Sequence, residues 1–75
     1  MNRDGRRRLK KVVDLLSHCE SIIQELYDEE EEKLMNLPEG LENSRLADSL
    51  QESMDELDEL LPEFDNLKDL VKRLC

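Results

Sequence analysis

Apolar side chains recur at helical spacing on both sides of one central break in the chain. In the first arm they follow alternating steps of three and four residues, the heptad pattern of packed helices: Leu9, Val12, Leu16, Cys19, Ile23 and Leu26. The second arm repeats this pattern with Leu46, Leu50, Leu57, Leu60, Phe64, Leu67, Val71 and Leu74. Ser53 is the one polar residue at a position of this stripe. The pattern predicts two long helices, over about residues 6–35 and 44–74.

The break between the two arms carries strong turn signals. Residues 36–43 contain Pro38 and Gly40, and Asn43 and Ser44 follow as residue types that begin helices. We therefore expect a loop over residues 36–43.

A chain that folds back at about Gly40 pairs residues whose numbers sum to roughly 80. Leu9 then faces Val71, and Leu26 faces Met54, so apolar stripe meets apolar stripe. This register predicts an all-α, antiparallel two-helix hairpin, similar to a coiled coil, with residues 1–75 forming a single domain.

Pro62 interrupts the second arm. Proline removes a backbone donor and crowds the preceding helical turn, so the helix either continues with a kink or ends near Leu60 and restarts at Pro62. Because the apolar stripe keeps its phase across this position, we favour a continuous helix that is kinked at Pro62.

The apolar face of the first arm is wider than one partner helix can cover. Val13, Leu15 and Ile22 flank the stripe and would stay wet in a lone hairpin. We therefore expect a homodimer that forms a four-helix bundle. The alternative is that the uncovered stripe binds another protein.

Charge is strongly segregated along the chain. Residues 1–14 and 63–75 carry nine cations against five carboxylates, whereas residues 15–62 carry two against fifteen, within a total charge of −9. A hairpin would therefore have a basic end, where both termini meet, and a long acidic body. The first helix also has its cations at its start and its acids at its end, opposite to the order that the helix dipole favours.

Few residue types suited to catalysis are present. His18 and Cys19 are adjacent, so on a helix they point in different directions and do not form a nucleophile and base pair. The acidic run around Glu30 lacks both the loop of a calcium site and the Glu-x-x-His spacing of a di-iron bundle. We therefore expect no enzyme, no cofactor and no metal. Glu30 falls on the seam, where it either marks a point at which the helices splay apart or pairs with Lys33 or Arg45.

Binding surfaces are better candidates than catalytic sites, although pairing across the hairpin or between subunits, together with solubility, also explains the segregated charge. The acidic run could bind a basic protein or, as a rigid carboxylate array, imitate a nucleic-acid backbone and block a host-defence protein. The basic start could instead contact nucleic-acid phosphates, which we regard as the weaker alternative because no aromatic residue accompanies it. The candidate residues are Leu15, Ile22, Asp28, Glu29, Glu31, Glu32, Arg6, Arg7 and Arg8.

The segment Tyr27–Ser44 reads YDEEEEKLMNLPEGLENS, and acidic heptads follow it. This arrangement resembles short helical-hairpin proteins of bacteriophages and mobile elements, with a pattern like R-x-E-E-E-x-x-x-x-L-P-E-x-L-x-x-S. The resemblance implies a helical hairpin of phage or prophage origin, but no activity or site. The function that we expect is a small phage-type accessory protein that modulates a partner protein through its helical surface. Pro62 departs from the uninterrupted second helix of that group.

The N-terminal residues are basic but lack the apolar stretch of a signal peptide, and no segment is apolar enough to span a membrane. We therefore expect a cytoplasmic protein, in the host cell if it is phage-encoded, with both cysteines reduced.

Overall fold

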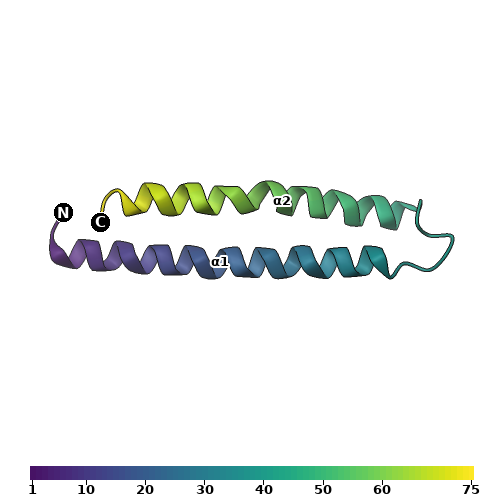
Figure 1. The fold of residues 1–75 in the computed structure, drawn as a ribbon, viewed down its shortest axis with the longest axis horizontal. Coiled ribbons are helices and arrows are strands. Elements are labelled where there is room, and N and C mark those ends of the chain that lie inside the picture. The colour runs from purple at the N-terminus through teal and green to yellow at the C-terminus, as the bar shows by residue number, and fades with distance from the viewer.

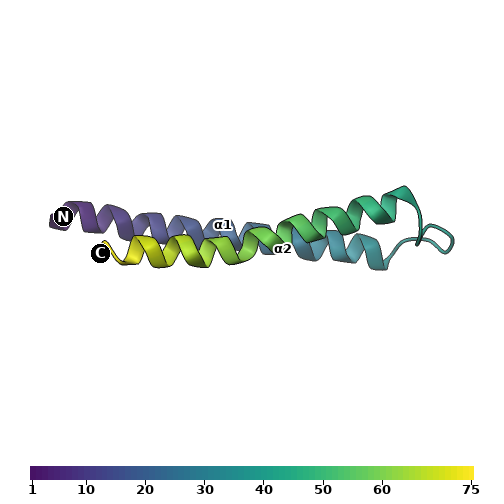
Figure 2. The same cartoon turned by 90° about the horizontal axis from the view of Figure 1, so that it is seen from above.

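A computed structural model describes residues 1–75 and contains two helices and no strand. Helix α1 spans Arg3–Met35 and helix α2 spans Arg45–Lys72. The helices lie side by side and run in opposite directions, so the two termini lie at one end of a rod 60 Å long (Figure 1). Seen from above, α2 passes across α1 (Figure 2). The prediction of an all-helical chain with two packed helices is confirmed.

Side-chain caps and a tight turn define the ends of the helices. Asn2 caps α1, where its side-chain oxygen accepts a hydrogen bond of 2.7 Å from the backbone N–H of Gly5. This cap explains why α1 begins three residues before the predicted start. In the loop, the N–H of Leu41 donates to the carbonyl of Pro38, and Gly40 has φ 95°, as the third position of a type II turn requires. Ser44 then caps α2.

The closed part of the core lies next to the loop. Only three residues of the chain are buried, Ala47, Leu50 and Met54, and all three belong to the first half of α2. Toward the termini the residues between the helices are only half-buried. The hairpin therefore has a core that is complete at one end and open at the other.

The helices pack through a column of residues next to the predicted one. On α1 the half-buried residues of this column are Leu9, Val13, Leu16, Glu20, Ile23, Tyr27, Glu30 and Leu34, and Gly5 and Ser17 are half-buried as well. Those on α2 are Ala47, Leu50, Ser53, Met54, Leu57, Leu61, Phe64, Lys68 and Val71. The prediction that Val12, Cys19 and Leu26 lie in the seam is wrong, because these three residues are exposed. The same holds for four residues predicted for the seam of α2: Leu46, Leu60, Leu67 and Leu74. On each helix, one of the two packing columns lies one residue later than predicted. On α1, for example, Tyr27 packs against α2 in place of Leu26.

The predicted register is also wrong. Lys68 contacts Glu20, about two turns farther along α1 than the expected register places it, and Leu26 lies beside Leu57 and Leu60 instead of Met54. Helical side chains tilt toward the N-terminus of their own helix, and in an antiparallel pair these tilts point in opposite directions along the axis. Contacting residues therefore have higher numbers on both helices than backbone levels suggest. These contacts are shifted by three to eight residues from the predicted pairs.

Helix α2 continues through Pro62 without interruption. Of the two interpretations of this proline, the structure has the continuous helix and not the break. Pro62 is exposed, so the carbonyl that loses its helical hydrogen bond can be hydrated.

We expect Pro62→Ala to raise the free energy of unfolding by about 1–3 kcal/mol, because alanine restores the missing hydrogen bond and removes the clash. Urea unfolding followed by circular dichroism measures this change. Asp69→Ala is the matched control, since Asp69 lies one heptad further on the same side of α2 and should change stability by under about 1 kcal/mol. An unchanged or lower stability of Pro62→Ala would show that the proline fits this helix without cost.

Candidate functional site

Apolar side chains left exposed by the packing form two columns, one on each helix. We call these residues together the apolar face: Val12, Leu15, Cys19, Ile22 and Leu26 on α1, and Leu60, Leu67, Leu70 and Leu74 on α2. Leu15 and Ile22, both predicted candidates, are 58% and 43% exposed. Large apolar patches of this kind are uncommon on lone proteins and are typical of binding surfaces.

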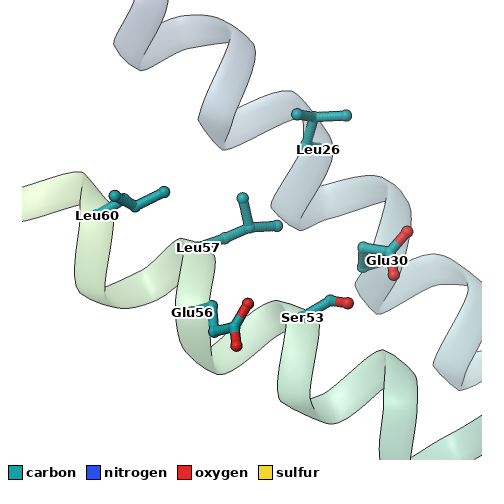
Figure 3. A pocket seen from close by; sticks show the side chains of 6 residues that line it. All are labelled: Leu26, Glu30, Ser53, Glu56, Leu57 and Leu60. Atoms are coloured by element: carbon teal, nitrogen blue, oxygen red, sulfur yellow. The ribbon is translucent and has the colours of Figure 1, made fainter.

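The two columns lie on the same side of the hairpin. Leu26 of α1 and Leu60 of α2 line one hollow, together with Leu57 (Figure 3). Steps of seven residues stay on one side of a packed helix. Cys19 and Val12 therefore continue the column of Leu26 toward the termini, and the α2 column continues from Leu60 through Leu67 and Leu74.

Both ends of the apolar face are hollowed, and the two hollows carry opposite charge. The hollow near the middle of the rod is lined by two carboxylates, those of Glu30 and Glu56, among its six residues (Figure 3). The hollow at the N-terminal end is lined by one cation and otherwise uncharged side chains: Met1, Gly5, Arg8, Leu9 and Val12. The face thus has a basic hollow at one end and an acidic hollow at the other.

The opposite side of the hairpin is more polar. Near the termini, Val13 there is surrounded by Lys10, Asp14 and Lys72. The hairpin as a whole is therefore amphipathic across its short axis, as a single surface helix is.

The predicted acidic residues are exposed and make few contacts within the chain. Asp28 accepts a hydrogen bond from Gln24, and no ion pair involves Glu29, Glu31 or Glu32. Glu30 pairs with Lys33 at 3.1 Å, one of the two partners expected for it. The segregated charge is therefore not used up by pairing between the two helices.

The three predicted arginines do not share one patch. Arg6 and Arg7 surround one depression together with Arg3 and Lys10. Arg8 lies instead in the hollow at the end of the apolar face. One basic cluster is thus free on the outside of α1, while Arg8 belongs to the apolar face.

A single ion pair links the two helices. The ammonium of Lys68 on α2 donates to the carboxylate of Glu20 on α1 at 2.8 Å and also lies 3.4 Å from Asp65. The hydrogen bond to Glu20 raises the pKa of Lys68 above its ordinary value of 10.5, against a smaller opposing effect of desolvation. Both members stand at packing positions, so the pair fixes the relative register of the helices.

The raised pKa predicts loss of stability in alkali. The contribution of Lys68 is complete below pH 10.5 and is lost as the pH rises through the higher folded-state value. We expect the urea midpoint of the wild type to fall more between about pH 9 and pH 12 than that of Lys68→Arg, because arginine stays charged over this range. Equal decreases in both chains would show that other groups cause the alkaline loss.

Neither a metal site nor a membrane-crossing segment is found in the structure. No three His, Cys, Asp or Glu side chains come together in a way that could hold a metal ion. Neither helix has an apolar stretch long enough to cross a membrane. Cys19 belongs to the apolar face, and the adjacent His18 is exposed.

The sequence interpretation missed most of the α2 half of the apolar face, because it assigned Leu60, Leu67 and Leu74 to the seam. The signal that could have revealed them is Tyr27 and Met54, large residues one position later in the heptad, whose columns offer a second possible seam despite Glu20 and Lys68. No protein-family profile, curated protein or solved structure matches this chain.

Proposed function

We propose that this chain is a non-enzymatic protein-interaction module that works through its apolar face. One observation carries the proposal. Nine apolar side chains line one side of the rod, most of them more than two-fifths exposed, while only three residues of the whole chain are buried. Most of the apolar surface that could stabilise this protein is thus available to a partner.

The first partner that we propose for the apolar face is a second copy of this chain. Two hairpins that pack through their apolar faces form a four-helix bundle. Burying a half-exposed leucine completely contributes roughly 1 kcal/mol, and the face offers leucines from both helices of each copy. The open end of the core would then be closed by the partner. Pro62 stands about 200° around α2 from Leu60, on the outer side, where a kink would bend the helix toward the bundle.

The biological role that fits this module is a small phage-type accessory protein that modulates a host or phage protein through its helical surface. Support comes from the loop segment and acidic heptads described above, which resemble those of phage helical hairpins. The exposed acidic body of the rod, in the cytoplasm of the host, would be offered to a basic partner.

Ile22→Glu should convert the dimer into a monomer, because a carboxylate in the centre of the apolar face cannot be buried without a partner. Sedimentation equilibrium at micromolar concentration should give twice 8.9 kDa for the wild type and 8.9 kDa for the variant, with Kd raised at least about 100-fold. The matched control is Ser21→Glu, which adds the same charge one residue away, outside the face. A wild type that sediments as a single chain would contradict the homodimer.

The unpaired carboxylates favour a second candidate, the imitation of nucleic acid. Asp28, Glu29, Glu31 and Glu32 stand on one exposed stretch of α1, and the rod is 60 Å long. Such an array could occupy a basic channel on a nucleic-acid-binding protein. The cluster of Arg3, Arg6, Arg7 and Lys10 leaves a third candidate, direct contact with nucleic-acid phosphates.

One titration separates these candidates. If the chain imitates nucleic acid, it should displace labelled duplex DNA from a basic probe such as the histone octamer, and a fourfold increase in salt should weaken this at least about tenfold. The variant with Asp28→Asn, Glu29→Gln, Glu31→Gln and Glu32→Gln should not displace it. The same DNA without the octamer tests the third candidate, because a gel shift that Arg6→Ala/Arg7→Ala abolishes would support it. No displacement and no shift would leave the apolar face as the functional surface.

A further inference from the structure

We infer that the second copy packs on the apolar face in the antiparallel direction, about a two-fold axis that passes near Cys19 and Leu67. This inference rests on the proposed homodimer and adds its geometry. A two-fold axis within the interface allows two arrangements, one with the basic ends together and one with the basic ends at opposite extremes. The spacing of the apolar side chains and the distribution of charge both select the second.

The apolar face is symmetric about its own centre. On α1, Val12 and Leu26 each lie seven residues from Cys19, in opposite directions. On α2, Leu60 and Leu74 each lie seven residues from Leu67. Because Leu26 and Leu60 line one hollow, equal steps from them place Cys19 and Leu67 at one level of the rod. An antiparallel copy centred there puts leucine or valine opposite leucine at both ends.

The two hollows obey the same symmetry. Arg8 in the basic hollow and Glu30 in the acidic hollow each lie eleven residues from Cys19, in opposite directions. Rotation about the proposed axis therefore brings Arg8 of one copy to the acidic hollow of the other, twice per dimer. Within one chain these residues are about 33 Å apart along α1, so they cannot pair with each other.

Charges along the edges of the face are arranged likewise. Lys11 and Arg73 flank the face near the termini, whereas Glu25 and Glu59 flank it near the middle of the rod, and all four are exposed and without an ion pair in the chain. Antiparallel packing places each cation near an opposite carboxylate. Parallel packing would place cations on cations and carboxylates on carboxylates, which is unfavourable.

A spin-label distance distinguishes the two arrangements. In the chain with Cys19→Ala, which keeps the centre of the face apolar, and Cys75→Ser, Met35→Cys provides one labelling position, since Met35 is 76% exposed at the last residue of α1. Met35 lies sixteen residues from position 19, so pulsed electron resonance should give about 50 Å between the labels of an antiparallel dimer. Side-by-side loops in a parallel dimer would give less than about 35 Å and would overturn the inference.

Charge exchange tests the contact between the hollows. Arg8→Glu should raise the Kd of the dimer about tenfold, and so should Glu30→Arg, because each places like charges opposite each other. The double variant Arg8→Glu/Glu30→Arg should return to within about threefold of the wild type. Ser21→Glu provides the control for added charge alone. Without rescue, the antiparallel contact is wrong.

The experiments separate the inference from the proposal on which it rests. A dimer in sedimentation with a short label distance leaves the proposed module intact and overturns only its direction. A chain that remains monomeric, with no label pair within range, overturns the homodimer and its geometry together. A long distance with charge rescue supports both.

Discussion

The controlling constraint is that one helix can cover only one side of another. Both helices of this chain carry apolar residues across a width that exceeds a single packing seam, so packing α1 on α2 must leave part of each apolar surface outside. In this hairpin the exposed remainders fall on the same side, as Leu26 and Leu60 at one hollow show. An excess on each helix thereby becomes one continuous face, and a two-helix chain acquires a surface suited to binding.

The polar residues at the seam determine which columns are covered. Lys68 and Glu20 replace apolar residues in the covered columns, and their 2.8 Å contact satisfies both charges where the helices meet. The exposed columns, by contrast, contain only apolar residues from Val12 to Leu26 on α1. The chain thus places its one inter-helix ion pair inside the hairpin and leaves its more uniform apolar surface outside. If only the stability of the isolated hairpin mattered, the more uniform apolar columns would be covered and the columns with Lys68 and Glu20 would be exposed.

The sequence was sufficient to predict the two helices and the loop, but not which face of each helix packs against the other. Heptad spacing, Pro38, Gly40 and Ser44 located both helices and the loop to within a few residues, and the width of the α1 face predicted the exposure of Leu15 and Ile22. The seam could not be chosen between Leu26 and Tyr27, because each belongs to an apolar column with the same period. Register was misjudged because side-chain tilt shifts the contacts of antiparallel helices away from backbone levels. The resemblance to phage proteins stays a prediction.

The order of charges along α1 makes sense when the rod is considered with a partner. Cations at the start and acids at the end oppose the dipole of α1, at a cost of about 0.3–1 kcal/mol per exposed charge before screening. The acids also find few partners on α2, where the carboxylates of the first half repel them. Across an antiparallel interface the same order becomes complementary, since Arg8 and Glu30 are equally far from the centre of the face. An arrangement unfavourable in one helix thus favours one direction of assembly over the other.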